Sequence, residues 1–292
     1  MGTVTVGRTL YRCGRERAVV PMELRAGTVE GHWTPLAACQ ASRVVAQMTP
    51  SEGEALLREL GNMAPSKSSM DRLPKGLNAR WEAHREAFES TLREAAVVPD
   101  EVVTVAVSLD GVMVPMKEAQ RAEKRERSHA AGRRTKGPAG YQEAGCTTLS
   151  FYDAEGERLD TVSLARMPEP KKATLKTMLS VELDTVLGRR PDLEVVTVAD
   201  GAHDNWRYLD ALAPDAMRYA DTQARHLPIG SGVVEAACRT LVTQRLKRSG
   251  MRWRRAGGQA ILTLRSLLQS ARFEQAWALV LQNLSSRCDR PR

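Results

Sequence analysis

The chain has 292 residues, which exceeds one average domain and leaves room for a main domain with a smaller appendage. Its hydrophobic content of 42% is ordinary for a globular protein, and no apolar run reaches the about 18 residues of a membrane span. The net charge of +8 and the pI near 9.5 favour a polyanionic partner, because neutralising phosphates releases their counterions.

Five cysteines are widely scattered in the sequence, and no two of them form a Cys-x-x-Cys pair. This spacing argues against a disulfide framework and against a zinc ribbon, so we expect reduced thiols. The N-terminal sequence MGTVTVGRTLYRCGRERAVV also lacks the apolar stretch of a secretory signal. These features lead us to expect a cytoplasmic protein.

The first predicted helices lie in the N-terminal third of the chain. Residues 35–48 have a helical pattern and predict one helix. Thr49 is a suitable N-cap for a second helix, with Pro50 at its first position and Glu52 as a capping-box acid. This second helix is expected to end at Gly61.

A short third helix is predicted after the next turn. Ser66 is its N-cap, and Pro74 is expected to end it, because proline cannot donate the helical hydrogen bond. Three helices with a turn before the last are typical of a helix-turn-helix, in which the last helix offers Lys67, Arg72 and hydroxyl groups to a DNA groove. An ordinary helical cap on the main domain has the same pattern.

The character of the sequence changes to β after an amphipathic helix predicted over residues 76–95. The segment VVTVAVSLDGVMVPM, residues 102–116, alternates and predicts a strand. Val105 and Val107 fall on one face of this strand. Asp110 falls on the other face, among small residues.

A hairpin, a long helix and a further strand follow. Residues 145–153 and 157–165 predict the hairpin, residues 171–190 the helix, and residues 191–200 a strand that ends at Asp200. This β-β-β-α-β-α order predicts an α/β protein with the mixed sheet of the ribonuclease H-like fold. In that fold the first and fourth strands lie side by side, so Asp110 and Asp200 would be neighbours.

We therefore expect three segments along the chain. Residues 1–100 would form a β and mainly helical N-terminal region that contains the candidate helix-turn-helix. Residues 101–255 would form the ribonuclease H-like catalytic core, and residues 256–292 would form C-terminal helices.

A third acid lies on a helix that is predicted between the turn at Ser231 and Gly250. Glu235 falls one position beyond the capping-box site and borders an apolar stripe. That stripe consists of Val234, Cys238, Leu241 and Val242. Asp110, Asp200 and Glu235 together would offer hard oxygen ligands to Mg²⁺ or Mn²⁺ and act as catalytic residues. Taken singly, each acid also fits a structural role as a turn residue or as a solvated helix acid.

Cations gather in two stretches that we expect to hold DNA phosphates. Residues 117–136 are strongly basic, and the sequence QRLKRSGMRWRRAGG mixes cations with a tryptophan. A solvated loop is the alternative for the first stretch, and packing is the alternative for Trp253. Including the third helix, the candidate DNA-binding residues are Lys67, Arg72, Lys124, Arg125, Arg133, Arg134, Lys136, Arg245, Lys247, Arg248, Arg252, Trp253 and Arg254.

Several segments resemble bacterial insertion-sequence transposases of the DDE type, in the ISKra-type group. They are SLDGVMVPMK, RTKGPAGY, VADGA and LPIGSGVVEAACRTLVTQRLKRSGMRWRRAGGQAILTLRSL, and the likeness runs over residues 20–277. The resemblance implies a ribonuclease H-like core with Asp110, Asp200 and Glu235 as its acidic triad. It also implies magnesium-dependent cleavage and strand transfer of DNA at element ends and target, by a homo-oligomer at the bacterial nucleoid.

The sequence departs from that family between the second Asp and the Glu. Members carry a long helical insertion there, whereas only 34 residues separate Asp200 from Glu235 (235 − 200 − 1). We therefore expect an internal deletion with its joint between Pro214 and Met217. An inactive, truncated remnant that only binds DNA is the alternative function, and a nuclease that cuts without joining is a further one.

Overall fold

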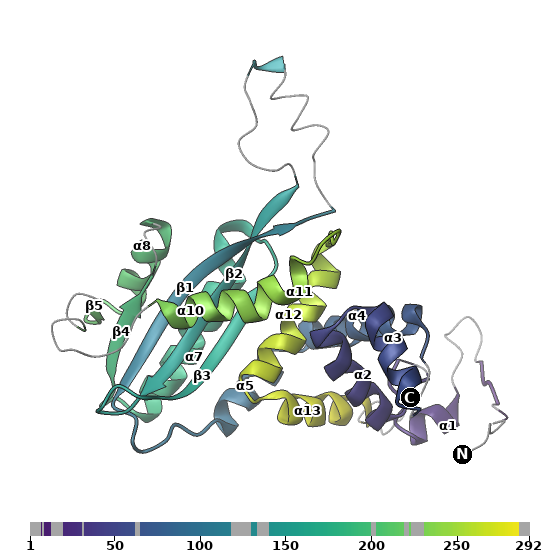
Figure 1. Ribbon diagram of the computed structural model, residues 1–292. Coiled ribbons are helices and arrows are strands. Elements are labelled where there is room, and N and C mark those ends of the chain that lie inside the picture. Colours follow the sequence, from purple (N-terminus) through teal and green to yellow (C-terminus); the bar gives the residue numbers. More distant parts are fainter. Residues whose placement is uncertain are drawn as a thin grey trace. The chain divides into compact units, whose positions relative to one another are not determined.

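The structure is a computed structural model that describes residues 7, 9–12, 20–30, 32–61, 65–117, 130–132, 140–199, 203–218, 222 and 231–285 (Figure 1). It divides the chain into two compact units. One unit comprises residues 1–88 and 274–292, and the other comprises residues 89–273. This division differs from the three expected segments, because the C-terminal residues are split between the two units.

The first unit is helical. Its elements are α1 (Pro21–Arg25), α2 (Pro35–Gln47), α3 (Pro50–Glu59), α4 (Lys67–Ala83), the start of α5 (Arg85–Ala95) and most of α13 (Phe273–Ser285). The predicted capping box of α3 is confirmed, because the Thr49 hydroxyl accepts from the Glu52 N–H and the Glu52 carboxylate accepts from the Thr49 N–H. Ser66 caps α4 as predicted, by accepting a hydrogen bond from the Ser69 N–H.

The predicted end of the third helix at Pro74 is wrong. Helix α4 continues through Pro74 to Ala83, and the predicted helix over 76–95 begins instead as α5 at Arg85. The proline removes one hydrogen bond, but Met70 and Leu77 on either side of it are buried in the core of this unit. Packing of the apolar face therefore outweighs the local signal of the proline.

The second unit is built on a mixed sheet with the strand order β3-β2-β1-β4-β5. Its strands are β1 (Thr104–Pro115), β2 (Tyr141–Tyr152), β3 (Arg158–Arg166), β4 (Glu194–Val198) and β5 (Met217–Arg218). Strand β1 pairs antiparallel with β2 and parallel with β4, so the expected neighbourhood of the first and fourth strands is confirmed. The short β5 was not predicted, and it pairs with β4 directly after the suspected joint.

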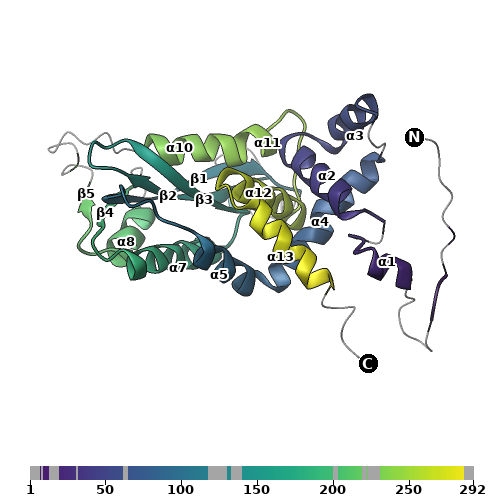
Figure 2. The same cartoon turned by 90° about the horizontal axis from the view of Figure 1, so that it is seen from below.

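Helices cover both faces of this sheet (Figure 2). Helices α7 (Ala173–Arg189) and α8 (His203–Leu212) lie on one face, and α10 (Gly232–Ala237) lies on the other. The core under α7 contains Val105, Val107 and Leu109, as the alternation of the first strand predicted. Asp110 lies on the α10 face, where its carboxylate meets Cys238. Among the helices that the structure describes, none is long and apolar enough to cross a membrane.

Helix α12 (Arg255–Gln269) covers the outer edge of β3. The Met167 N–H donates to Gln259 Oε1 at 2.9 Å, and the Ser163 N–H donates to Ser270 Oγ at 2.8 Å. The same two side chains donate back to the carbonyl oxygens of Ala165 and Ser163. Side chains thus satisfy backbone groups that a further strand would otherwise have paired.

Gly258 allows the first turn of α12 to approach Met167. A Cβ at this position would lie 2.4 Å from Met167 Sδ and 2.5 Å from Met167 Cε, and Met167 is buried. We expect Gly258→Ala to destabilise the unit by about 1–3 kcal/mol through overpacking, which exceeds the about 1 kcal/mol gained in helix propensity. Gly188→Ala, in α7 with no atom within 4 Å of the new Cβ, should stabilise it slightly. Urea unfolding of both variants tests the contrast, and equal effects would contradict the close approach.

Candidate active site

Asp110 lies within β1 and is half-buried. Its Oδ1 accepts a hydrogen bond from the Gly111 N–H at 2.6 Å. Its Oδ2 lies 3.4 Å from Cys238 Sγ, which donates to it from the helix that follows α10. Because each carboxylate oxygen has two acceptor positions, both oxygens keep one position open for a further ligand.

Two cysteines lie near this carboxylate: Cys238, which the sequence pattern placed only in the apolar stripe of its helix, and Cys146, which no pattern marked. Cys146 is the register partner of Asp110 on β2, and both Cys146 and Cys238 are buried. The neighbouring Cys146 thiol, burial and the Asp110 carboxylate all raise the pKa of Cys238. Cys238 therefore remains a neutral thiol that donates to Asp110. No local sequence pattern reveals this contact, because it depends on hairpin register and on helix packing.

Glu235 lies on α10, one helical turn before Cys238. Its side chain is exposed, whereas Val234 and Cys238 beside it are buried, so its predicted place at the border of the apolar stripe is confirmed. Its Oε1 accepts a hydrogen bond from the Ser231 hydroxyl at 2.8 Å, so the backbone does not use this carboxylate oxygen. Residues three apart on a helix have Cβ atoms about 5–6 Å apart, so Glu235 is a near neighbour of the residue that contacts Asp110.

Asp200 lies outside the described residues. The last described pair between β1 and β4 is Ser108 with Val198. Asp110 follows Ser108 by two residues, and Asp200 follows Val198 by two residues. In the sequence, each of the two acids therefore follows its member of this parallel pair by the same number of residues.

Two carboxylates of this site, those of Asp110 and Glu235, lie within the described residues and bear on its fit to Mg²⁺. Carboxylate oxygens of Asp110 and Glu235 are the hard ligands that Mg²⁺ and Mn²⁺ prefer. Within the described ranges, no group of three or more His, Cys, Asp or Glu side chains is arranged to hold a metal ion. The expected triad therefore has two described members, and Asp200 would have to supply the third.

The helix that carries Glu235 is unbroken from Gly232 to Leu246, as predicted, but its middle part is widened, which the sequence did not predict. Residues Cys238–Thr243 form a π-helix, and a short α11 (Gln244–Leu246) follows it. Arg265 from α12 donates to the carbonyl oxygen of Leu241 at 2.8 Å and also to that of Thr240. Burial lowers the pKa of Arg265. This arginine supports the widened helix just after Cys238.

Six of the candidate DNA-binding cations are described and exposed. They are Lys67, Arg72, Lys247, Arg248, Arg252 and Arg254. The two on α4 belong to the helical unit, and the other four belong to the sheet unit. Lys124, Arg125, Arg133, Arg134 and Lys136 lie outside the described residues.

Arg245 is a correction to the predicted set of DNA-binding residues. Its side chain is only 1% exposed, and its guanidinium lies 5.2 Å from the centre of the Trp253 ring. The Trp253 indole donates to the carbonyl oxygen of Leu246 at 2.9 Å. These contacts make Arg245 and Trp253 a packed cation–π pair, because burial removes the arginine from any phosphate.

The segment with the exposed cations near Trp253 is hydrogen-bonded, through the Trp253 backbone, to the end of the strand that carries Asp110. The Trp253 N–H donates to the Pro115 carbonyl oxygen at 2.9 Å, and the Lys117 N–H donates to the Trp253 carbonyl oxygen at 2.7 Å. Pro115 is five residues from Asp110 on β1, which corresponds to about 17 Å along a strand. Trp253, which stands between Arg252 and Arg254 in the sequence, thus lies beside one end of the same strand. No family model matches the chain, and no curated protein matches it.

Proposed function

We propose that the chain is a DNA transposase of the DDE type, with a ribonuclease H-like sheet unit and the catalytic residues Asp110, Asp200 and Glu235. One observation carries this proposal: the hydrogen bond between Cys238 Sγ and Asp110 Oδ2, which seats the Glu235 helix directly over Asp110. The strand order β3-β2-β1-β4-β5, with β1 parallel to β4, supports the proposed fold. The sequence resemblance supports transposition as the function of the protein.

In this proposal the protein groups hold the two described carboxylates, Asp110 and Glu235, in fixed directions. The Gly111 N–H and the Cys238 thiol orient the Asp110 oxygens, and the Ser231 hydroxyl orients Glu235. When bound, Mg²⁺ supplies activation of the attacking hydroxyl and stabilisation of the leaving oxygen. Asp110, Glu235 and Asp200 would hold it, because carboxylate oxygens suit this ion.

The proposed partner is DNA, namely the element ends and the target. Lys247, Arg248, Arg252 and Arg254 are exposed and are tied to β1 through Trp253. Lys67 and Arg72 offer cations on α4 of the helical unit. In this interpretation the cations hold phosphates and carry no base specificity.

The experiment that tests the proposal is a strand-cleavage assay on DNA from the flanks of the encoding gene, with Mg²⁺ or with EDTA. We expect nicked strands with 3′-hydroxyl ends and joined products only when Mg²⁺ is present. Binding without cleavage would show a remnant that only binds DNA. Cleavage without joined products would identify a nuclease.

A further inference from the structure

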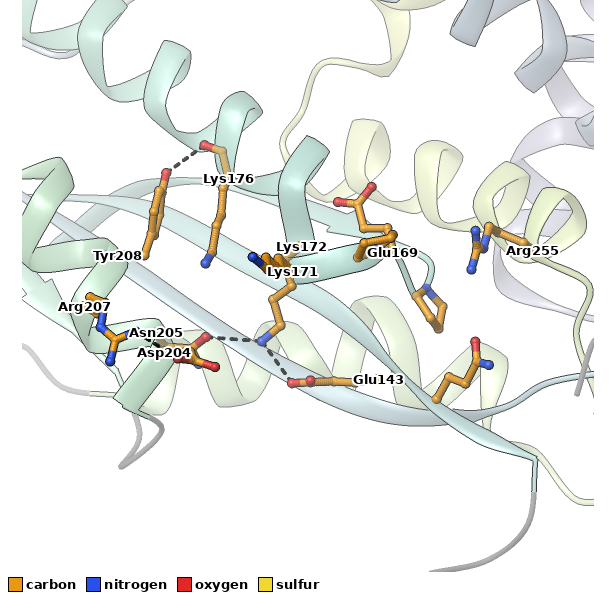
Figure 3. A pocket seen from close by; sticks show the side chains of 13 residues that line it. Glu143, Glu169, Lys171, Lys172, Lys176, Asp204, Asn205, Arg207, Tyr208 and Arg255 are labelled. Atoms are coloured by element: carbon orange, nitrogen blue, oxygen red, sulfur yellow. Dashed lines mark hydrogen bonds and ion pairs between the residues drawn. The ribbon is translucent and has the colours of Figure 1, made fainter. Parts of the chain in front are cut away.

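A pocket of about 900 Å³ opens on the α7 side of the sheet unit, opposite the face that carries Cys238 (Figure 3). Its charged lining consists of five cations and three acids. The cations are Lys171, Lys172, Lys176, Arg207 and Arg255, and the acids are Glu143, Glu169 and Asp204. This volume lies in the range of sites for small molecules, and the lining has an excess of positive charge.

Two of the acids are engaged within the fold. Glu143 forms an ion pair with Lys172 at 2.9 Å. Glu169 Oε1 accepts a hydrogen bond from the Leu175 N–H at 2.9 Å and so caps the start of α7. Neither of these carboxylates is paired with Lys171 or Lys176 among the contacts of the described residues. The positive charge of these two lysines therefore remains available to an anion.

The floor of the pocket is built against the backbone of β1. Lys172 Nζ donates to the Asp110 carbonyl oxygen at 3.4 Å and to Asn205 Oδ1 at 3.3 Å. Asn205 Nδ2 in turn donates to the Leu109 carbonyl oxygen at 3.2 Å. Figure 3 shows Lys172 between Asn205 and Glu143. Asp110 thus takes part in both sites: its carboxylate contacts Cys238, and its carbonyl oxygen contacts Lys172 at the floor of the pocket.

A cross-strand pair of glycines makes room for this floor. Gly111 on β1 and Gly145 on β2 are register partners. A Cβ on Gly111 would lie 1.9 Å from Glu143 Oε1, and a Cβ on Gly145 would lie 2.6 Å from Leu175 Cδ2. A larger residue at Gly111 would therefore displace Glu143, which lines the pocket, and one at Gly145 would displace Leu175 in the core beneath it.

The lysines at the pocket are held in specific positions. Lys171 and Lys172 both have left-handed backbone conformations, with φ of 55°. Lys176 Nζ lies 4.8 Å from the centre of the Tyr208 ring, and the Tyr208 hydroxyl donates to the Lys176 carbonyl oxygen at 2.7 Å. Burial, with a contribution from Asp184, raises the pKa of Tyr208 to about 12, so this hydroxyl remains a donor. Left-handed backbone in residues other than glycine is costly and concentrates at ligand sites.

We infer that this pocket binds a phosphate group, with Lys171 and Lys176 as its principal contacts and Lys172 as its floor. Ammonium groups make strong, charge-assisted hydrogen bonds to phosphate oxygens. The phosphate belongs either to a DNA strand or to a free phosphate compound. This site goes beyond the proposed cleavage chemistry, because it uses neither the carboxylates nor a divalent ion.

The inference is tested by titrating the full chain in EDTA with inorganic pyrophosphate and, separately, with a fluorescent single-stranded 12-nucleotide DNA. We expect Lys171→Glu to weaken pyrophosphate binding about tenfold or more, because it removes a charged contact. The matched control is Arg158→Glu, an exposed cation on β3 outside the pocket, which should stay within about twofold of wild type.

The DNA titration distinguishes the two sources of phosphate. A parallel loss of DNA affinity in Lys171→Glu, but not in Arg158→Glu, identifies a strand as the occupant. A loss confined to pyrophosphate identifies a free phosphate compound. Equal pyrophosphate affinity in Lys171→Glu and wild type, or no pyrophosphate binding by wild type, overturns the inference. Because EDTA abolishes metal-dependent cleavage, failure here is distinct from failure of the proposed function.

A second variant separates binding from folding. Lys171→Gly removes the charge and also relieves the left-handed backbone, which only glycine adopts without cost. We expect its thermal midpoint to rise by about 2–4 °C, while its pyrophosphate affinity falls as in Lys171→Glu. A fall in both quantities would assign Lys171 a structural role and overturn its part in the pocket.

Discussion

Replacing Asp110 by asparagine is expected to lower Mg²⁺-dependent strand cleavage by at least about 10³-fold. Asparagine keeps the size of the side chain, and its oxygen still accepts from the Gly111 N–H or the Cys238 thiol. It lacks the negative charge that a divalent ion requires. Metal-ion catalysis lowers the activation barrier by several kcal/mol, and this lowering would be lost. Nicking of DNA from the gene flanks, followed over time on a denaturing gel, measures the loss.

The control for this variant is Asp160→Asn, because Asp160 is an exposed acid on β3 that contacts only the backbone N–H of Thr161 among its described partners. DNA affinity in EDTA should remain at the wild-type value in both variants, since neither removes a cation. Undiminished nicking by Asp110→Asn would refute the assignment of Asp110. A loss of DNA affinity in that variant would show that the carboxylate has a structural role.

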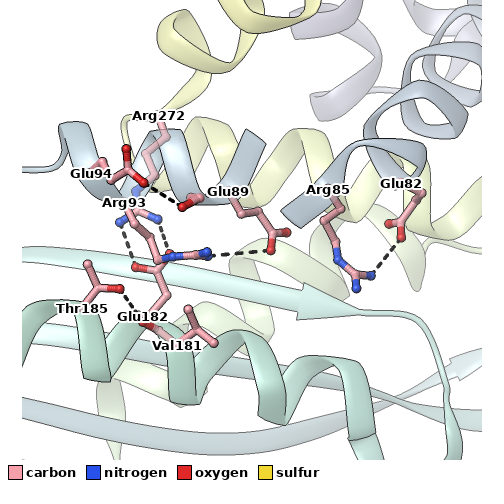
Figure 4. A network of polar contacts seen from close by, with 10 residues as sticks. Glu82, Arg85, Glu89, Arg93, Glu94, Val181, Glu182, Thr185 and Arg272 are labelled. Atoms are coloured by element: carbon pink, nitrogen blue, oxygen red, sulfur yellow. Dashed lines mark hydrogen bonds and ion pairs between the residues drawn. The ribbon is translucent and has the colours of Figure 1, made fainter. Parts of the chain in front are cut away.

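The largest change in stability is expected from Glu182→Ala. Glu182 lies on α7 and pairs with Arg272, which follows α12, through contacts of 2.5 and 3.0 Å (Figure 4). The side chains are only 5% and 12% exposed, so the variant leaves a nearly buried guanidinium without its counter-charge. We expect the free energy of unfolding of the sheet unit to fall by about 3–5 kcal/mol, measured by urea denaturation.

Two comparisons make the Glu182 prediction specific. Asp204→Asn removes an almost fully exposed partner of Arg207, at 3.8 Å, and should change the free energy of unfolding by less than about 1 kcal/mol. The double variant Glu182→Leu with Arg272→Met should recover most of the lost stability, because apolar side chains can replace a buried ion pair. A small effect of Glu182→Ala would show that water reaches Arg272 in solution.

The strands of the sheet unit could be predicted because their signals are local. Alternating valines define β1, and the sequence Asp-Ala-Glu-Gly between β2 and β3 defines a hairpin. The end of α4 was misplaced because the core packing of Met70 and Leu77 overrides the proline between them. β5 has two residues, too few for any periodicity to show.

The sequence predicted the acidic residues of the candidate site, but it did not predict the residues that surround them. Asp110 and Glu235 stand out as acids among small and apolar residues, and the structure brings their elements together through Cys238. The role of Arg245 was misjudged, because a cation in a basic stretch gives no sign that it will be buried under Trp253. The contacts of Lys172 with Asn205 and with the β1 backbone join residues far apart in sequence, so only the fold shows them.

Neither edge strand of the described sheet, β3 or β5, is open to extended pairing with a strand of another molecule. Gln259 and Ser270 imitate a neighbouring strand along β3, and β5 at the opposite end has only two residues. Among the strands that the structure describes, neither sheet edge therefore offers a second copy of the chain a long, open strand for a continuous intermolecular sheet. We therefore expect self-association of the proposed transposase to use helices or a shared DNA molecule. A chain shortened before α12 would lose this protection and would be prone to aggregate through β3.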